Sequence, residues 1–362
     1  MTGSPADASG SFGDGAVPWA AAVATGIGSM PGTSSRDAAR IVAGELPEFA
    51  HVPELPVRGP GSDLIGRTGG LLAGVASGLG METTPQGWRF GGGLGREMRR
   101  AQSFLGEDLD ALEEQLQEYA GPLKCQVAGP WTLAAAIELR TGERALRDPG
   151  AVADLAEALA HAVVDHVADL RRRVPRASAF VVQVDEPGLP AVLAGRIGTA
   201  SGLSSYRAVD EQDAERILRS VLAAVGAAGA LPGVHCCADE PPVDLLRRSG
   251  ARFVSVDLTR AGTEQGLDDP LGRAWEAGVG ILAGVVPSTG AGDLPDSVAS
   301  APLRALLHRL GLEDPRWLDR VAVTPACGLA GATPEWARTA LAACSAVGRV
   351  VRNDAPVEGG RA

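Results

Sequence analysis

The chain has 362 residues, of which 45% are hydrophobic, so it can bury a large core as two modest domains or as one barrel-sized domain. Its net charge of −11 disfavours nucleic acid and anionic membranes as partners, because both select basic protein surfaces. No apolar run approaches the roughly 20 residues that a membrane span requires. We therefore expect a small-molecule substrate and no membrane association.

The two ends of the chain differ in composition from the rest. Residues 1–16 are rich in Gly, Ser, Ala and Asp and lack the basic and apolar regions of a secretory signal. We expect a disordered tail there, a second one at residues 353–362, and a single domain over residues 17–352. The five cysteines form no closely spaced framework, which indicates free thiols in a reducing, cytoplasmic compartment.

Short apolar segments rich in Val and Ala alternate with longer segments whose apolar residues recur at helical spacing. This alternation is typical of repeated βα units around a parallel sheet. Strands are expected at residues 21–27, 49–52, 123–127, 179–184, 233–237, 253–256, 280–285 and 321–324. Helices are expected at residues 35–46, 107–119, 131–140, 151–173, 211–228, 243–249, 293–310 and 334–347. Eight such units predict an α/β fold of the TIM (β/α)8 barrel type.

Residues 54–106 fit this pattern poorly. The segment contains many glycines and shows no clear helical period. We expect a long insertion over the barrel mouth that can include a β-hairpin.

The predicted strands end in residues that can carry chemistry. In a barrel, the C-terminal ends of all strands share one rim, and the active site lies there. The residues at these ends are Ile27-Gly28-Ser29, Gln183-Val184-Asp185-Glu186-Pro187, His235-Cys236-Cys237, Asp257 and Cys327.

The His-Cys-Cys tripeptide indicates a metal site. Side chains alternate along a strand, so His235 and Cys237 point to the same side and Cys236 points away. Cys327 can join this pair if the last strand lies beside the barrel interior. Asp257, on the strand after the His-Cys strand, is a candidate fourth ligand. One imidazole with two thiols favours Zn²⁺, and three protein ligands leave one position for a carboxylate or a substrate.

The alternative is that these are ordinary buried residues, because free cysteine is among the most buried residue types and is often inert. The H-x-C pattern alone does not decide between the two. A further cysteine in a loop of small residues, together with an acid on the intervening strand, favours the metal site. Two further cysteines and three histidines on helical segments are expected to be packing or solvated residues: Cys125, Cys344, His161, His166 and His308.

Five motifs occur together along the chain: Ile27-Gly28-Ser29 with Pro31, Gln183-Val184-Asp185-Glu186-Pro187, His235-x-Cys237, Val256-Asp257-Leu258-Thr259-Arg260 and Cys327-Gly328-Leu329. In this order and spacing, from about residue 21 to residue 350, the chain resembles the C-terminal catalytic barrel of cobalamin-independent methionine synthase. The resemblance implies a barrel of the uroporphyrinogen decarboxylase and methionine synthase type, a superfamily that also shares the region of Gly129-Pro130-Trp131.

The resemblance implies a zinc-dependent methyltransferase that transfers a methyl group to the thiol of homocysteine and forms methionine. Carried over by position, His235, Cys237 and Cys327 are metal ligands. Asp257 stands where the family has a glutamate ligand and is one methylene shorter. The chemistry agrees with this assignment, because a divalent cation stabilises the thiolate, which is the nucleophilic form of a thiol.

The other rim residues suit the recognition of an amino acid. Asp185 is the candidate catalytic residue and can accept a hydrogen bond from the substrate ammonium group. The backbone and hydroxyl of Ser29, with Ile27 and Gly28, can hold the substrate carboxylate. Glu54 is a second candidate for the ammonium group. For Asp185 the alternative is a turn that ends the strand, where Asp is common.

Two kinds of methyl donor are compatible with the sequence. The family has a histidine after the seventh strand that is thought to protonate the departing folate, and residues 284–289 contain none. A corrinoid leaves without a general acid, so a methylated corrinoid on a partner protein is an alternative donor to methyltetrahydrofolate. Other readings are a zinc enzyme acting on a different thiol and a non-catalytic, zinc-stabilised barrel. A decarboxylase is disfavoured because it needs no metal.

Overall fold

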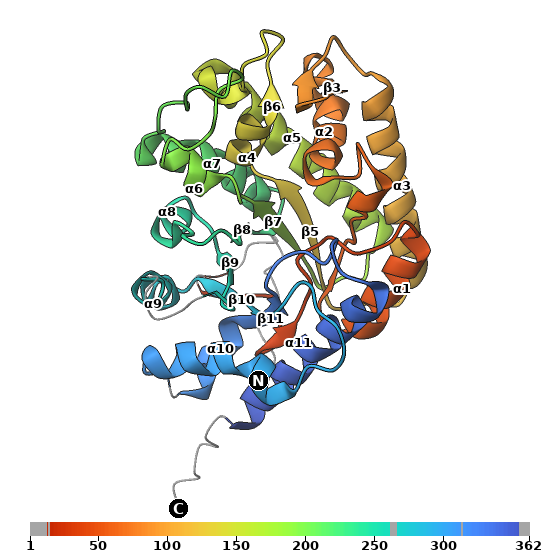
Figure 1. Cartoon of the computed structure of the whole chain (residues 1–362). Coiled ribbons are helices and arrows are strands. Elements are labelled where there is room, and N and C mark those ends of the chain that lie inside the picture. Colours follow the sequence, from red (N-terminus) through yellow and green to blue (C-terminus); the bar gives the residue numbers. More distant parts are fainter. Residues whose placement is uncertain (1–12, 14, 261–265, 313, 355–362) are drawn as a thin grey trace, which may run out of the picture.

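Eight parallel strands form the centre of the molecule (Figure 1). The computed structural model describes residues 13, 15–260, 266–312 and 314–354. Neighbouring strands pair in parallel throughout this sheet. Across the sheet the order is β1 (Val23–Ala24), β11 (Val321–Pro325), β10 (Gly280–Val286), β9 (Phe253–Asp257), β8 (Leu231–Cys236), β7 (Ala179–Asp185), β5 (Pro122–Ala128) and β2 (Ala50–His51).

All eight predicted strands are present in this sheet. The central ones are buried along their whole length, as in the seven-residue strands β5, β7 and β10. Burial on both faces is the reason that their sequences read as apolar runs without alternation. The edge strands β1 and β2 are shorter than predicted, with two residues each.

The two edge strands meet beyond their own ends. Ser29 and Glu54 form an isolated parallel bridge. The backbone N–H of Met30 donates to the Glu54 carbonyl at 2.8 Å, and the N–H of Glu54 donates to the Gly28 carbonyl at 3.1 Å. The sheet therefore curls until its edges are joined at this bridge, which fits the predicted TIM-like barrel.

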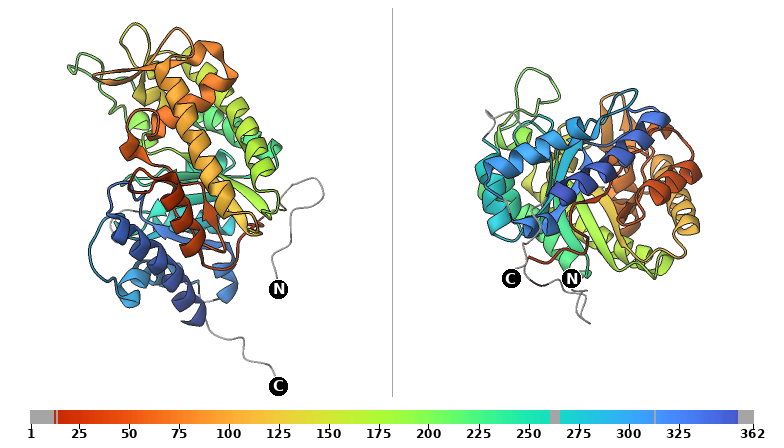
Figure 2. Two further views of the ribbon diagram at one scale, coloured as in Figure 1. Left: turned by 90° about the vertical axis from the view of Figure 1, so that its right-hand side faces the viewer. Right: turned by 90° about the horizontal axis from the view of Figure 1, so that it is seen from below.

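Helices cover the outside of the sheet, and the views of Figure 2 show them on several sides of the strands. The first and last long helices pack against each other. In the described part of the chain, no helix has both the length and the hydrophobicity needed to cross a membrane. The helices are α1 (Ser35–Glu45), α2 (Leu64–Val75), α3 (Arg96–Gln115), α4 (Pro130–Ala136), α5 (Pro149–Arg173), α6 (Leu189–Leu193), α7 (Glu211–Ala227), α8 (Val243–Arg248), α9 (Asp268–Glu276), α10 (Asp296–Arg309) and α11 (Pro334–Asp354).

Each predicted helix overlaps an observed one, but three helices were not predicted: α2, α6 and α9. Helix α11 continues to Asp354, so residues 353 and 354 are helical rather than part of a tail. Most of the two predicted tails, at residues 1–16 and 353–362, lies outside the described residues.

The segment 54–106 is more ordered than predicted. It contains the expected hairpin, β3 (Met81–Thr84) and β4 (Gly87–Phe90), which β6 (Ile137–Glu138) extends to a three-stranded sheet. It also contains α2 and the first half of α3, where we expected no helix. The glycines of α2 explain the error. A Cβ on Gly69 would lie 1.7 Å from Met81, and one on Gly66 would lie 2.4 Å from Trp88. Close packing thus selects glycine, although glycine disfavours a helix.

A small apolar cluster, separate from the main core, lies at the N-terminal ends of the strands. Trp19 stacks on Phe49 with ring centroids 5.3 Å apart and meets Phe253 edge-on at 5.8 Å. The apolar cluster closes this end and leaves the other end for polar side chains. Its members are Trp19, Val23, Phe49, Val181, Leu231, Phe253, Leu282 and Ala322.

Candidate metal centre

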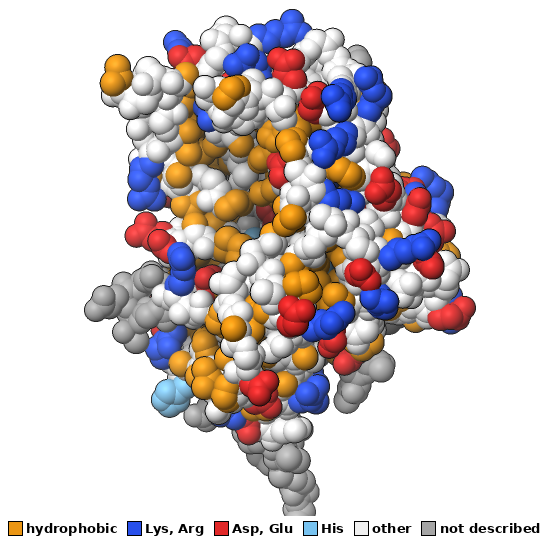
Figure 3. Space-filling model, turned by 45° about the vertical axis from the view of Figure 1, so that its right-hand side comes forward, with side chains coloured by type: hydrophobic (Ala, Val, Ile, Leu, Met, Phe, Trp, Pro, Cys, Tyr) orange, Lys and Arg blue, Asp and Glu red, His pale blue; other side chains and the backbone are white. Residues whose placement is uncertain are grey.

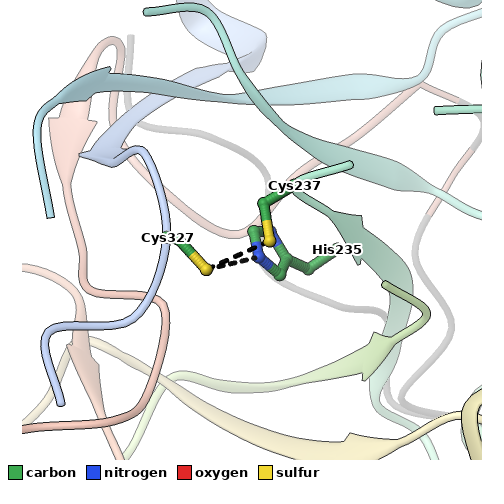
Figure 4. Close-up of side chains that lie close together, drawn as sticks. All are labelled: His235, Cys237 and Cys327. Atoms are coloured by element: carbon green, nitrogen blue, oxygen red, sulfur yellow. Dashed lines mark hydrogen bonds between the residues drawn. The ribbon is translucent and has the colours of Figure 1, made fainter. Parts of the chain in front are cut away.

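The side chains of His235, Cys237 and Cys327 point toward one another at the C-terminal ends of β8 and β11 (Figure 4). The two sulfur atoms are 3.0 Å apart, and the Cys327 Sγ lies 3.9 Å from Nε2 of His235. All three potential ligand atoms lie within 4.8 Å of one another. The structure therefore brings together the three soft donors that the sequence singled out.

A hydrogen bond orients the ring of His235. Its Nδ1 lies 2.9 Å from Oγ of Ser255, the residue opposite His235 in the β8–β9 register. Because Nδ1 is engaged by the serine, Nε2 is left to face the two thiols. Histidines that bind metals commonly fix their other ring nitrogen in this way. Ser255 was not identified from the sequence. It lies two residues before Asp257 on the same strand, and residues two apart share a face of the sheet.

The hydrogen bond between the two thiols moves their pKa values in opposite directions. The hydrogen bond with Cys237, supported by His235 and opposed by burial, lowers the pKa of Cys327 to about 4. The same hydrogen bond, together with burial, raises the pKa of Cys237. Cys327 is thus favoured as the thiolate, the form of cysteine that binds metals.

These donors fit zinc. Tetrahedral zinc, with bonds of roughly 2.3 Å to sulfur and 2.0 Å to nitrogen, places two sulfur ligands about 3.8 Å apart and sulfur and nitrogen about 3.5 Å apart. The observed separation of 3.9 Å between Cys327 Sγ and His235 Nε2 is about 0.4 Å longer than this geometry, whereas the two sulfur atoms, 3.0 Å apart, would have to separate by about 0.8 Å to bind one ion. Thiol and imidazole donors prefer zinc to the hard cations Mg²⁺ and Ca²⁺, and three donors leave one coordination position open.

Asp257, the expected fourth ligand, does not join this group. Its Oδ1 accepts hydrogen bonds from the N–H of Thr259 at 2.8 Å and from the Thr259 hydroxyl at 2.6 Å. Its Oδ2 lies 3.6 Å from Nε of Arg260. The carboxylate thus binds Thr259 and Arg260, which follow it in the chain, and it lies outside the cluster of ligand atoms. Asp257 is on the same rim as the cluster because its strand is next to β8, but its short side chain contacts these nearby residues instead of the cluster.

Asp185 lies beside the metal donors. It is opposite His235 in the β7–β8 register, and neighbouring strands are about 5 Å apart. Its side chain is buried, and Nε2 of Gln183 donates to its Oδ1 at 2.8 Å. Burial, opposed mainly by His235, raises the pKa of Asp185 to about 7. The residue is therefore a carboxyl group whose charge responds to what binds next to it.

Buried side chains of β5 and β7 hold the carbonyl group of Ile27 by hydrogen bonds. It accepts hydrogen bonds from Nζ of Lys124 at 2.7 Å and from Nε2 of Gln183 at 3.0 Å. The next residue, Gly28, packs so closely that a Cβ there would lie 2.6 Å from the side chain of Gln126. Side chains of β5 and β7 thus fix the path of the Ile27-Gly28-Ser29 loop.

Ser29 connects this loop to the metal donors. Its carbonyl accepts a hydrogen bond from the N–H of Leu329 at 2.8 Å. A Cβ on Gly328 would lie 2.0 Å from the Ser29 Oγ. The glycine after Cys327 is therefore required for the serine to pack over the cysteine loop, and the two predicted motifs form one surface.

Glu54 is buried and meets an arginine that the sequence analysis did not identify. Nε of Arg67, on α2, lies 3.3 Å from Oε1 of Glu54. Burial raises the pKa of Glu54, and Arg67 is the strongest opposing influence. Arg67 carried no signal in the sequence because α2 itself was not predicted.

Lys124 is a second missed cation. It is fully buried in β5, where burial lowers its pKa to about 8 and Asp185 is the main opposing influence. A lysine inside an otherwise apolar strand is unusual, because a buried charge is costly unless it is paired. A lysine at this position could therefore have been singled out from the sequence. Lys124 and Arg67 are cations that oppose the negative charge of Glu54, and Lys124 also opposes that of Asp185.

The cysteines outside the cluster and the three histidines on helices lie where packing or solvation was expected. Cys125, Cys236 and Cys344 are buried and free. His166 is buried on α5, where burial lowers its pKa to about 4. His161 and His308 are exposed.

The surface is hollowed between the upper and lower halves of the molecule, and hydrophobic side chains gather around the hollow (Figure 3). Charged side chains are more frequent on the convex surface around it. A recess of this kind suits a small molecule.

A family model matches most of this chain, and one solved structure shares its fold. Residues 22–349 match the family described as the cobalamin-independent synthase, catalytic domain. Among solved structures, a B12-independent methionine synthase from Shewanella sp. W3-18-1 in complex with selenomethionine is 14% identical, with a TM-score of 0.59 over 92% of this chain and 99% of that chain. A 2,3-dimethylmalate lyase is 13% identical, with a TM-score of 0.33 over 85% of this chain and 76% of that chain. No functionally curated protein matches the chain.

Proposed function

Because this chain belongs to the family of the cobalamin-independent synthase catalytic domain, we propose that it is a zinc-dependent methyltransferase that forms methionine from homocysteine on a methionine synthase-like (β/α)8 barrel. The observation that carries the proposal is the convergence of one imidazole and two thiols beside a buried carboxyl group. This arrangement combines a site for a thiol with a site for an amino group.

His235, Cys237 and Cys327 would hold the zinc ion, and the substrate sulfur would take the open position. Bound zinc would stabilise that sulfur as the thiolate, which is the nucleophile in methyl transfer. Asp257 can reach the metal only by giving up its hydrogen bonds to Thr259, so we propose that the protein supplies three ligands. All five cysteines are free, and metal binding needs reduced thiols, which supports a cytoplasmic location.

The amino-acid part of homocysteine would bind along the rim next to the metal. Asp185 and Glu54 supply carboxylates for the ammonium group, and the Ile27-Gly28-Ser29 loop supplies a hydroxyl and backbone groups for the carboxylate. The related Shewanella structure contains selenomethionine, which has the shape of the proposed product. Asp185 would be the residue that joins the two parts, because it lies beside both His235 and the amino-acid site.

The methyl donor would be either methyltetrahydrofolate or a methylated corrinoid on a partner protein. The loop after β10 contains Pro287, Ser288 and Thr289 and no histidine. It is held in place by Trp336, whose Nε1 donates to the Pro287 carbonyl at 3.1 Å. A donor whose leaving group needs no proton is compatible with this loop. A different thiol as acceptor, or a non-catalytic zinc site, is the alternative to be tested.

The test is a methyl-transfer assay with homocysteine and a panel of donors, comparing the wild type with Cys327→Ser. Cys344→Ser is the matched control, because Cys344 is a buried cysteine on α11 that does not belong to the cluster of metal donors. We expect activity in the wild type and the control and none in Cys327→Ser. Full activity in Cys327→Ser would remove Cys327 from the site. A zinc-loaded wild type that methylates no thiol from any donor would favour the non-catalytic alternative.

A further inference from the structure

A chain of buried charges leads from the rim into the segment 54–106. Nε of Arg67 lies 3.3 Å from Glu54, and Nη1 of the same guanidinium donates to Oδ2 of Asp108 at 2.6 Å. The side chains of Glu54, Arg67 and Asp108 are at most 6% exposed. Ion pairs buried to this degree are costly to break, because the charge that loses its partner stays buried.

Asp108 is itself held by other groups. Nη2 of Arg58 donates to the same Oδ2 at 2.7 Å, and Oγ of Ser35 donates to Oδ1 at 2.7 Å. The carboxylate of Asp108 is therefore a fixed anchor on α3. Two buried arginines share this anchor, but the polar contacts of Arg58 are with Asp108, Ser35 and Glu107, whereas Arg67 reaches Glu54.

Helix α2, which carries Arg67, is docked on the rim by a second contact. The hydroxyl of Thr68, the next residue, accepts a hydrogen bond from the N–H of Ala128 at 2.9 Å. Ala128 is the last residue of β5 and lies opposite Asp185 in the register. The position of the Arg67 guanidinium is thus fixed relative to both carboxyl groups of the amino-acid site.

The charge of Glu54 depends on this arrangement. A carboxyl group buried without a cation favours its neutral form. Burial acts in that direction on the pKa of Glu54, and Arg67 opposes it more strongly than Gln126 and Lys124 do, while Asp108 acts with burial. A neutral carboxyl group cannot balance the charge of a substrate ammonium group.

We propose that Arg67 is a positioning residue for Glu54: anchored by Asp108, it holds the Glu54 carboxyl group in place and favours its charged form, so that the site selects thiols that carry an α-amino group. This inference rests on the proposed function, in which Glu54 contacts the substrate ammonium group. It assigns a role in substrate selection to α2, a helix between β2 and β5 that packs against β5.

The experiment measures thiol binding to the full-length protein with Co²⁺ in place of zinc, because thiolate ligation changes the Co²⁺ absorption spectrum. Homocysteine is compared with 4-mercaptobutyric acid, which has the same thiol and carboxylate but no amino group. In Arg67→Met we expect the dissociation constant for homocysteine to rise about 10- to 100-fold, the range for a hydrogen bond to a charged group. The dissociation constant for 4-mercaptobutyric acid should stay unchanged.

Arg58→Met is the matched control, because it removes an equally buried arginine from the same oxygen of Asp108. We expect it to lower the melting temperature while leaving the preference for homocysteine intact. In the double variant Glu54→Gln/Arg67→Met, homocysteine should bind as in Glu54→Gln alone, because the two residues act as one unit. If Arg67→Met does not fold, Arg67→Lys is tested instead. Lysine keeps the positive charge but lacks the several N–H donors of a guanidinium, so we expect a smaller loss of the preference for homocysteine over 4-mercaptobutyric acid.

Three results would each overturn the inference. The Arg67 variants could bind both thiols more weakly by the same factor, or Arg58→Met could lose the preference for homocysteine to the same extent. The losses of homocysteine affinity from the two single changes could also add in the double variant. The proposed function would remain standing in those cases. If neither thiol changes the spectrum of the wild type, the proposed function fails, and the inference fails with it.

Discussion

The rim of the sheet has two halves that are built differently. The proposed metal half comes from β8, β9 and β11 and contains three soft donors, which contact one another, Ser255 and the backbone of Gly328. The proposed amino-acid half comes from β1, β2, β5, β7 and α2 and contains buried charged groups that are paired within the protein. In our proposal a metal ion completes the first half, whereas the second half is already organised by the protein.

The difference follows from the cost of burial. A buried charge without a partner is strongly unfavourable, so Glu54, Arg67 and Lys124 must be paired before the protein is stable. A thiol is a weak donor and acceptor that can be buried at little cost. The metal half can therefore stay incomplete in the folded protein, and its residues should matter for metal binding more than for folding.

Cys237→Ser should have the largest effect. Loss of one of three ligands should lower zinc affinity by more than about 100-fold, because even loss of a group that only orients a ligand costs about 10- to 100-fold. Activity should fall with zinc content, while the melting temperature of the metal-free protein should change little. Zinc content by mass spectrometry and thermal melts check both points. A variant that binds zinc normally would contradict the assignment.

Asp185→Asn should have an intermediate effect and should leave the metal half intact. Loss of a charged hydrogen bond to the ammonium group should raise KM for homocysteine about 10- to 100-fold, with zinc content unchanged. Glu186→Gln is the control, because that neighbouring buried carboxylate accepts hydrogen bonds from Trp131 and Thr132 instead. It should lower stability rather than change KM. An unchanged KM in Asp185→Asn would separate Asp185 from the substrate.

Asp257→Asn should have the smallest effect. Asparagine keeps an acceptor oxygen for the two hydrogen bonds from Thr259, and the carboxylate lies outside the ligand cluster. Competitive zinc titration should therefore give an affinity within about twofold of the wild type, well below the cost of losing a ligand-supporting group. A tenfold loss of zinc affinity would show that Asp257 moves to the metal. Each half of the rim would then contain a carboxylate that binds a ligand.

The sequence by itself determined the sheet and the three soft donors. Strands buried on both faces leave an apolar run in the sequence, and chemically active residues that follow such runs share one rim in a parallel fold. His235, Cys237, Cys327 and Asp185 can therefore be placed on the rim from the sequence. The limit seen at Asp257 has the same origin, since strand order gives the rim but not the direction of a short side chain.

The tertiary structure decided everything that depends on close approach between distant segments. Helix α2 was not predicted because Gly66 and Gly69 weaken its helical signal, and their purpose is visible only when the hairpin packs against them. Arg67 lies on this helix and was therefore not identified either. Its ion pairs with Glu54 and Asp108 join segments that no local sequence pattern connects. Periodicity reports which face of an element is buried, but the partner of a buried charge is set by packing, which only the folded chain defines.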